Sequence, residues 1–409
     1  MIFRWSIFEE GGIVRNGIWL ASEKIILLGK GLLLAYLLAN WLNQEVYGAY
    51  QFIIAYLGAL SVFVLPGMGV AIVQAIARNK TGTFTVALRK VFLLALWGSV
   101  ILALTGGYYY LFVDSEKVAY LFFVLAAVFP GYSVMNFWRY YYTGYSRFGD
   151  LVRMSVFLEL LSLGFMLLAL LFFKNLEGLV ILGIIAPVPF SLLLIWKLLK
   201  SSRDLPIDND AIVFGKRISY ALSLSSVATY GDKLILGIFF GFTEVAIYGV
   251  ASIIPEQAKS IAASFMTPLL PKYSASVSLQ ELKKHLVVAT LGSIGVAFAL
   301  YALIPVVFTI FFPKYLVGIE YAQWLLLVLC LLPVVLLETY FRSQKDDVTV
   351  VRATVAGSLS GIALLALLVP SFGIMGAIGA KIGGLIVQGL IYFRLYSKLI
   401  TSGPEKPAA

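Results

Sequence analysis

The sequence is poor in the residues that build disulfide frameworks, metal sites and water-facing surfaces. Its 409 residues include one cysteine (Cys330) and one histidine (His285), and only 13% of them are charged. One residue of each type excludes a disulfide framework and leaves no ligand set for a metal site built from His and Cys. Soluble domains carry about 25% charged residues. The low charge therefore excludes an ordinary water-soluble domain.

Long apolar runs take the place of the missing charges, and 61% of the residues are hydrophobic. A membrane-spanning helix needs about 20 mostly apolar residues, and the absence of sustained period-two alternation favours helices over a barrel. We expect an all-α integral membrane protein with about twelve transmembrane helices, the first of them too long for a cleaved signal segment. The expected spans are residues 14–39, 46–71, 88–113, 117–141, 151–173, 177–199, 215–240, 245–270, 285–312, 318–341, 349–370 and 373–396.

The formal net charge of +10 suggests nucleic acid at first sight. The basic residues are spread over alternate connections, however, and no connection is a basic domain with interleaved aromatics, so we expect no nucleic-acid partner. By the positive-inside rule, these connections and both termini face the cytoplasm. The residues are Arg78, Lys80, Arg89, Lys90, Arg139, Arg147, Arg153, Lys197, Lys200, Arg203, Lys216, Arg217, Lys272, Lys283, Lys284, Arg342, Lys345 and Arg352, with Arg4, Arg15, Arg394, Lys398 and Lys406 near the termini.

The two halves of the chain resemble each other across a polar connection that runs from Lys200 to Arg217. In the first half, "GK" at Gly29–Lys30 is followed by "EVYG" at Glu45–Gly48; in the second, "GDK" at Gly231–Lys233 is followed by "EVAIYG" at Glu244–Gly249. Each copy has about six helices. Because six is even, both copies enter the membrane from the same side and are parallel repeats, which we expect to surround a central cavity. The expected domains are residues 1–199 and 215–409, with a cytoplasmic linker at 200–214.

Several charged residues fall inside the predicted spans. Glu23 and Lys30 are seven residues apart and share one face of a helix, with Lys24 on the adjacent stripe. Each central charge costs at least about 2.5–3.5 kcal/mol in a membrane, so a set of them implies a shared wet interior. The predicted substrate-binding cations are Lys24, Lys30, Lys233, Lys259 and Lys381. The predicted ion-coupling or counter-charge residues are Glu23, Asp232 and Glu256.

In this central layer the lysines outnumber the carboxylates, which predicts a cationic cavity suited to phosphate or pyrophosphate. A simpler role stays open for each pair, in which Glu256 and Lys259, or Glu23 and Lys30 or a neighbour, only neutralise each other. Glu159 and Glu338 are expected nearer the cytoplasmic ends. Glu338 has Arg342 four residues away as its partner.

Residues 15–39 and 47–78, and the repeated "YG" at Tyr248–Gly249, resemble polysaccharide-transporter flippases of the multidrug/oligosaccharidyl-lipid/polysaccharide (MOP) superfamily. The resemblance implies movement of an undecaprenyl-pyrophosphate-linked oligosaccharide, such as an O-antigen or exopolysaccharide repeat unit, from the cytoplasmic to the outer leaflet. It implies alternating access, often coupled in that family to an H+ or Na+ gradient as in an antiporter, without a cofactor, in the cell inner membrane. Charged residues on helices 1, 7 and 8 line the cavity in that family; those in this region here are Lys24, Lys30, Asp232, Lys233 and Lys259.

The resemblance also implies partners: the lipid-linked glycan, the bilayer, and the polysaccharide polymerase and chain-length machinery. Two complete repeats suffice for one working unit, so we expect a monomer. A multidrug exporter of the same fold would need an acidic cavity, and the bias here is cationic. A membrane glycosyltransferase or polysaccharide polymerase usually has a sizeable outer loop, whereas the outer connections at 40–45 and 114–117 are short, and no nucleophile–base constellation is visible. We therefore expect a transporter and not an enzyme.

Overall fold

The structure is a computed structural model that describes residues 13–113, 115–202, 205–266, 273, 279–344 and 347–402. Every regular element within these ranges is a helix, which confirms the predicted all-α class. Five of the basic residues predicted for the cytoplasmic side lie outside the described residues: Arg4, Arg203, Lys272, Lys345 and Lys406.

The chain forms two compact units whose segments alternate along the sequence. The first unit comprises Met1–Leu42 and Leu60–Ser223, and the second comprises Asn43–Ala59 and Leu224–Ala409. A segment of the N-terminal half thus packs with the C-terminal half of the chain. The predicted domains, with a linker at residues 200–214, follow the repeat in the sequence, whereas the two units follow the packing of the chain. The predicted division stays a prediction.

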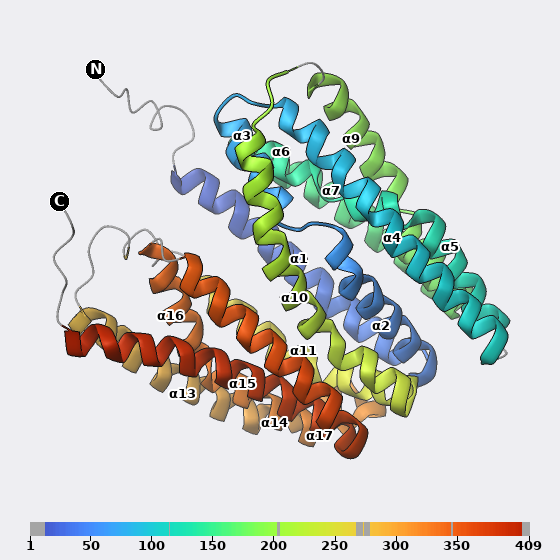
Figure 1. Ribbon diagram of the computed structural model, residues 1–409. Coiled ribbons are helices and arrows are strands. Elements are labelled where there is room, and N and C mark those ends of the chain that lie inside the picture. Colours follow the sequence, from blue (N-terminus) through green and yellow to red (C-terminus); the bar gives the residue numbers. More distant parts are fainter. Residues whose placement is uncertain are drawn as a thin grey trace. The chain divides into compact units, whose positions relative to one another are not determined.

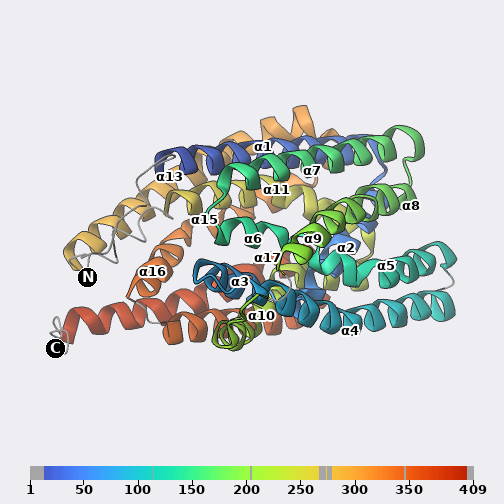
Figure 2. The same ribbon diagram turned by 90° about the horizontal axis from the view of Figure 1, so that it is seen from above.

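The first unit is built mostly from the N-terminal half, and Figures 1 and 2 show α4 running alongside α5 within it. The π-helical segments η3 and η4 interrupt two of its apolar runs. Its elements are α1 (Ile13–Trp41), η2 (Leu60–Phe63), α3 (Met68–Ala77), α4 (Gly82–Phe112), α5 (Glu116–Val134), α6 (Trp138–Gly144), α7 (Phe148–Leu168), η3 (Ala169–Phe173), α8 (Leu176–Gly178), η4 (Leu179–Ile185), α9 (Val188–Ser202) and the first part of α10 (Asn209–Phe240).

The second unit contains α2 together with the remaining helices. Its last helix, α17, folds back on itself in Figure 1. The elements are α2 (Gln44–Ala59), the later part of α10, α11 (Phe242–Met266), α13 (Leu279–Phe311), η5 (Pro313–Tyr315), α14 (Gly318–Leu325), α15 (Leu327–Cys330), α16 (Leu332–Ser343) and α17 (Asp347–Ser402).

Eight helical segments of the described chain are long and apolar enough to cross a membrane. The charged helices α1, α10 and α11, with 29, 32 and 25 residues, also exceed the length of about 20 that a span needs. The chain is therefore a multi-pass membrane protein. The eight segments are Gln44–Phe63, Gly82–Phe112, Glu116–Gly144, Phe148–Phe173, Leu176–Ser202, Gln280–Phe311, Gly318–Ser343 and Val348–Lys398.

Several predicted spans are divided in the structure, where the sequence predicts continuous helices: 117–141 between α5 and α6, 177–199 between η4 and α9, and the two described next. In residues 46–71 the helical run stops before Pro66, and the preceding residue Leu65 has a φ of 49°. Proline lacks a backbone N–H and disfavours helical geometry in the residue before it. Residues 318–341 are divided into α14, α15 and α16, with Pro333 in the first turn of α16. Prolines thus mark these last two interruptions.

The last predicted spans, 349–370 and 373–396, meet at the sharp bend of α17. Gly373 has φ 55° and ψ −129°, a combination that residues with a Cβ rarely adopt. The helical geometry stops there and resumes beyond it, so α17 consists of two helical stretches joined at Gly373. The predicted boundary coincides with this glycine.

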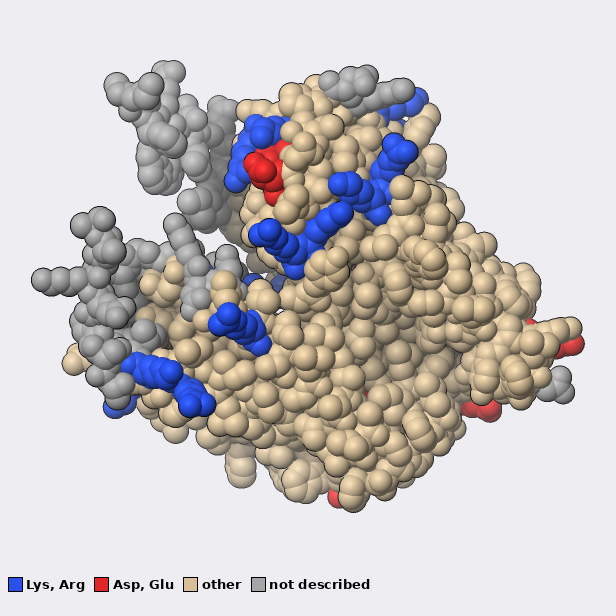
Figure 3. All heavy atoms as spheres, viewed as in Figure 1, with Lys and Arg blue, Asp and Glu red and all other residues tan. Residues whose placement is uncertain are grey.

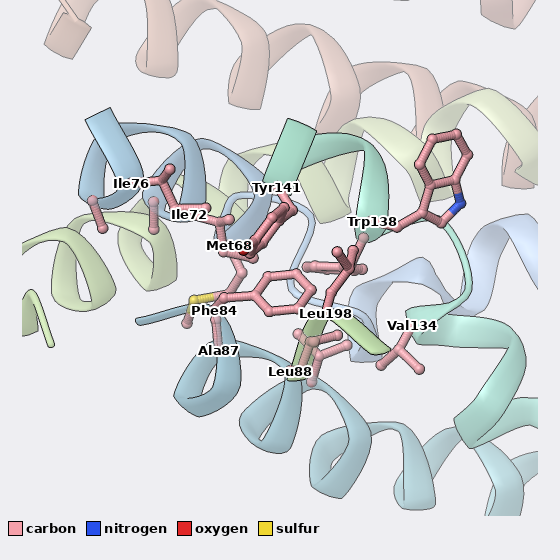
Figure 4. Packing of buried hydrophobic residues seen from close by; sticks show 14 of the residues in the cluster. Met68, Ile72, Ile76, Phe84, Ala87, Leu88, Val134, Trp138, Tyr141 and Leu198 are labelled. Carbon is pink, nitrogen blue, oxygen red and sulfur yellow. The ribbon is translucent and has the colours of Figure 1, made fainter. Parts of the chain in front are cut away.

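An apolar core holds one end of the first unit together (Figure 4). The Phe84 ring lies among Met68, Tyr141 and Leu198, which come from α3, α6 and α9. Phe84 is fully buried and meets the Tyr141 ring edge-on at 5.1 Å between centroids. Such close packing fixes the short helices α3 and α6 against α4.

Basic side chains gather at one end of the first unit, with acidic side chains among them. On the face shown in Figure 3, Lys and Arg side chains gather over the end that holds α3, α9 and the start of α4. The charges visible at the tip where α4 meets α5 are acidic. This gathering of Lys and Arg at one end is what the positive-inside rule predicts for one unit; the cytoplasmic orientation itself stays a prediction.

Asp208, in the central connection, ties this connection to the loop between α3 and α4. Its carboxylate accepts a hydrogen bond from the backbone N–H of Ala211 and forms ion pairs with Arg78 at 3.3 Å and Lys80 at 3.4 Å. Its own N–H donates to the Thr83 hydroxyl. The hydrogen bond from Ala211 is the main cause that lowers the pKa of Asp208; burial opposes it, and Arg78 and Lys80 lower the pKa further.

A carboxyl group with a lowered folded-state pKa stabilises the fold above its unfolded pKa, about 3.9, and this stabilisation is lost as the pH falls through the folded pKa. We expect Asp208→Asn to lower the melting temperature at neutral pH and to lessen its further decrease in acid. Thermal unfolding of the purified protein between neutral and acidic pH measures both effects. The exposed neighbour Asp210 supplies the control Asp210→Asn. Identical pH profiles for wild type and Asp208→Asn would show that the ion pairs add nothing.

Helices α2 and α11 pack so closely that one position admits only glycine. A Cβ on Gly48 would overlap the backbone carbonyl oxygen of Phe242, at the start of α11. A Cβ on Gly249, in α11, would meet the Gln51 side chain at 3.5 Å, an ordinary contact distance. The two glycines come from matching positions of the internal repeat, yet only Gly48 is required by close approach of backbones.

We therefore expect Gly48→Ala to destabilise the second unit by at least the about 1–3 kcal/mol typical of overpacking. Gly249→Ala is the matched control and should unfold close to the wild-type temperature. Thermal unfolding of the purified variants provides the comparison. Equal stability of the two variants would contradict this account of the α2–α11 contact.

Candidate functional site

The first unit contains a buried ion pair between α1 and α6. Arg139 donates to Glu23 Oε1 at 2.6 Å and to the Ser155 hydroxyl of α7 at 2.7 Å. The Glu23 side chain is 5% exposed and that of Arg139 is 32% exposed. A carboxylate so deep in a membrane protein requires a partner, and the guanidinium supplies it.

A second ion pair joins α1 and α7, further along both helices. Lys30 Nζ is 2.6 Å from Glu159 Oε2 of α7, and it also donates to the Ser162 hydroxyl at 3.2 Å. On α7, Ser155, Glu159 and Ser162 are spaced at four and three residues, so they share one face. This polar face of α7 meets the polar stripe of α1 predicted from the sequence.

The order of these contacts shows that α1 and α7 run in the same direction. Glu23 lies near Ser155 through Arg139, and Lys30, seven residues later, lies near Glu159 and Ser162. Parallel helices require an even number of crossings between their starts. The spans predicted from the sequence between residues 14 and 173 meet that requirement.

The second unit contains a cluster around Lys381 of α17. Lys381 Nζ is 2.7 Å from Glu256 Oε1 of α11 and 3.6 Å from Asp232 Oδ2 of α10. The buried Tyr248 hydroxyl donates to Asp232 Oδ2 at 2.6 Å, and the Tyr248 ring centroid is 5.9 Å from the Lys381 ammonium. One cation therefore serves two carboxylates contributed by two other helices.

Two further lysines lie next to this cluster without a carboxylate in ion-pair contact. Lys233 donates to the amide oxygen of Gln51 at 3.1 Å, and Gln51 in turn donates to the Tyr47 hydroxyl at 2.8 Å. Among the described residues, no hydrogen bond or ion pair reaches Lys259, which feels the charges of Glu256, Glu338 and Lys381 at longer range. The charge of both lysines is therefore only partly balanced.

Counted over the described residues alone, each unit holds one more cation than carboxylate in its polar layer. In the first unit, Lys24, Lys30 and Arg139 stand against Glu23 and Glu159; in the second, Lys233, Lys259 and Lys381 stand against Asp232 and Glu256. Lys24 is exposed on α1. The described residues contain no group of three or more His, Cys, Asp or Glu side chains that could hold a metal ion. The layer suits an anionic group better than a cation.

The structure changes several predicted pairings. Glu23 pairs with Arg139, which the sequence places among the basic connections, and not with Lys30. Lys30 takes Glu159, which was expected nearer the cytoplasmic end. Glu256 contacts Lys381 of a distant helix instead of Lys259, its neighbour one turn away. The spacing of residues along one helix suggests partners on that same helix. In the structure, these charged side chains instead pair with residues of other helices packed against their own.

Some predictions of local contacts are confirmed, and some contributors were missed. Glu338 pairs with Arg342 at 2.6 Å, as the four-residue spacing predicts. Four residues of the site were not predicted from the sequence: Arg139, Ser155, Tyr248 and Gln51. The signals available were a polar residue, Gln51, and an aromatic residue, Tyr248, inside predicted spans. The roles of the eight predicted site residues stay predictions.

The long apolar helices and the paired charges within them define a multi-pass membrane protein with polar groups inside its spans. A family model described as polysaccharide biosynthesis protein matches residues 13–275. The chain belongs to this family, which confirms the resemblance to polysaccharide-transporter flippases of the MOP superfamily.

Solved structures with the same fold are a flippase and transporters. The lipid II flippase MurJ, in an inward closed conformation, matches with a TM-score of 0.73 and 15% identity over 94% of this chain and 87% of that chain. An inward-facing multidrug resistance MATE family transporter of the MOP superfamily matches with a TM-score of 0.62 and 14% identity, covering 93% and 95%. A MOP superfamily transporter from Pyrococcus furiosus Vc1 matches with a TM-score of 0.59 and 16% identity, covering 95% and 96%. No curated protein matches the chain.

The Glu23–Arg139 pair provides a test of what the charges do for the fold. Glu23→Gln leaves Arg139 without its counter-charge. We expect a loss toward the lower end of the about 3–5 kcal/mol typical of broken buried pairs, because the Arg139 side chain is 32% exposed. The double variant Glu23→Gln/Arg139→Gln should recover much of that loss. Thermal unfolding of the purified proteins measures both.

The control is the exposed Asp150–Arg153 pair at 3.9 Å on α7. Exposed pairs contribute about 0–1 kcal/mol, so Asp150→Asn should leave the melting temperature nearly unchanged. A double variant of Glu23 and Arg139 less stable than Glu23→Gln would show that the two charges do not depend on each other.

Proposed function

We propose that this protein is a flippase that moves a polyprenyl-pyrophosphate-linked oligosaccharide from the cytoplasmic to the outer leaflet. The single observation that carries the proposal is the surplus of one cation among the described residues of the second unit's polar layer, where Lys233 and Lys259 have no carboxylate in ion-pair contact. Membership of the polysaccharide biosynthesis family and the fold shared with a lipid II flippase support it.

The chemistry of such a substrate explains why cations are useful inside a membrane. Neither a glycan nor a pyrophosphate can enter hydrocarbon without groups that replace water. Ammonium groups bind phosphate oxygens through charge-assisted hydrogen bonds. The polyprenyl tail needs no such replacement, so it can stay in the bilayer while the polar head passes along the protein.

Lys233 and Lys259 are the best candidates for the pyrophosphate contact in the second unit. Neither has a carboxylate in ion-pair contact among the described residues, so an incoming anion would not have to displace one. Lys30 and Lys381 are already engaged by carboxylates.

The remaining parts of the proposal follow from the family. The site alternates between inward-open and outward-open states, coupled to an ion gradient as in an antiporter, with Glu23, Asp232 and Glu256 as coupling or counter-charge groups. The substrate is an O-antigen or exopolysaccharide repeat unit. The protein works in the cell inner membrane as a monomer, with both termini cytoplasmic, and hands its product to the polysaccharide polymerase and chain-length machinery.

A multidrug exporter is the second candidate, because MATE transporters share the fold. The P. furiosus relative is described as a transporter whose binding pocket of reverse polarity suggests a different function. The cation surplus here is a comparable difference in polarity, and it disfavours an organic-cation substrate. A membrane glycosyltransferase or polysaccharide polymerase has no observation in its favour.

Replacement of Lys233 and Lys259 by alanine tests the proposed contact. Hydrogen bonds to charged groups contribute about 1.5–3 kcal/mol, so the double variant should flip a labelled polyprenyl-pyrophosphate-linked glycan about ten- to a hundredfold more slowly. Appearance of the label in the opposite leaflet of proteoliposomes is the measurement. Lys197→Ala, which removes an exposed lysine of α9, is the control.

Normal flipping by a folded Lys233→Ala/Lys259→Ala variant would contradict the assignment of these lysines. Transport of an organic cation by the wild type, with no flipping of the glycan lipid, would instead favour the exporter.

A further inference from the structure

The carboxylates of the second unit already share a cation that belongs to the protein. Lys381 Nζ lies 2.7 Å from Glu256 Oε1 and 3.6 Å from Asp232 Oδ2. The Lys381 side chain is only 19% exposed, so water screens these contacts poorly. The ammonium occupies the position between two carboxylates that a bound monovalent cation would need.

With Lys381 in place, Asp232 has no open position for a further cation. Its Oδ2 accepts from the Tyr248 hydroxyl at 2.6 Å as well as facing Lys381, and its Oδ1 accepts from the backbone N–H of Lys233 at 2.7 Å. The side chain is 5% exposed. A hard cation needs several oxygen ligands at once, and the remaining free side of Oδ2 faces the Lys381 ammonium.

Glu256 has a different environment. Its side chain is 50% exposed, and its one ion-pair partner among the described residues is Lys381. It also feels the positive charges of Lys233 and Lys259. Glu256 is therefore the member of the cluster that an ion from outside the unit reaches, while Asp232 acts as a fixed anion.

The charges around the cluster add to the barrier against a second cation. Three lysines stand against two carboxylates, so an incoming sodium ion would enter a region that is already net positive. A proton can be accepted by one carboxylate oxygen without a coordination shell. The charged and titratable groups that face the cluster are Asp232, Lys233 and Tyr230 of α10, Tyr248, Glu256 and Lys259 of α11, Lys381 of α17 and, through Lys259, Glu338 of α16.

We propose that Lys381 is a tethered cation that excludes sodium from this cluster, so that the cluster exchanges protons through Glu256. When Glu256 takes up a proton it becomes neutral, and Lys381 loses its closest partner and keeps Asp232; release of the proton restores the pair. Occupation of the cation position by Lys381 is independent of transport. The statement that the coupling ion is H+ and not Na+ rests on the ion-coupled transport proposed above.

Sodium binding to the intact, purified protein tests the occupation. In wild type we expect the melting temperature to be the same in sodium and potassium chloride at equal ionic strength, and no saturable binding of radioactive sodium. Lys381→Met opens the position between the carboxylates, so this variant should gain a sodium-specific stabilisation. A further Glu256→Gln substitution should abolish the gain.

Wild-type sodium binding that is lost in Glu256→Gln would overturn the proposal. So would a folded Lys381→Met variant that gains no sodium effect, because Lys381 would then not be what excludes the ion. If Lys381→Met does not fold, the wild-type measurement and Lys381→Arg, which keeps a cation and should stay insensitive to sodium, decide the question. Lys197→Met, at the exposed lysine of α9, controls for loss of a positive charge.

The coupling ion is tested separately in proteoliposomes. An imposed pH gradient should change the wild-type flipping rate, and an imposed sodium gradient should not; the reverse result would overturn proton coupling. Absence of flipping under every gradient would count against the proposed function and would leave the sodium-binding result intact. The two failures are thus distinguishable.

Discussion

A charged side chain inside an apolar helix must have a partner, and this constraint organises both units of the protein. In the first unit it brings α1 against α6 and α7 through Glu23–Arg139 and Lys30–Glu159. In the second it gathers α10, α11 and α17 around Lys381. These contacts join helices that are far apart in sequence, so each ion pair also fixes a tertiary contact. Without the partners, the same charges would oppose insertion of the helices that carry them.

The pairing is incomplete in the second unit, and this links structure to function. A purely structural set of charges would balance, whereas the described part of this polar layer keeps one surplus cation. In the second unit the surplus is held by neutral or distant groups: Lys233 by the Gln51 amide, and Lys259 by the longer-range fields of Glu256 and Glu338. Such lysines can accept an anionic group without first losing a carboxylate. Pyrophosphate fits this chemistry, which is the basis of the proposed function.

The sequence predicts the helices well and their contacts poorly, for physical reasons. Length and hydropathy indicate the spans, and Gly373 lies at the predicted boundary of the last two. The prediction of continuous helices failed where prolines intervene. The predicted span 46–71 is apolar throughout, but its helical run stops before Pro66. The stripe of Glu23 and Lys30 on α1 was visible from spacing. The partners Arg139 and Glu159 were not, because they depend on which helices pack together, and Arg139 was grouped with the basic connections.

The central claim is that the surplus cations bind a diphosphate. The most direct measurement is the binding of undecaprenyl pyrophosphate to the intact protein, compared with undecaprenol of the same chain length, by native mass spectrometry or thermal shift. The account predicts that the diphosphate binds more tightly and that the difference decreases as salt concentration rises. Equal binding of the two lipids would show that the tail alone is recognised, and it would contradict the claim.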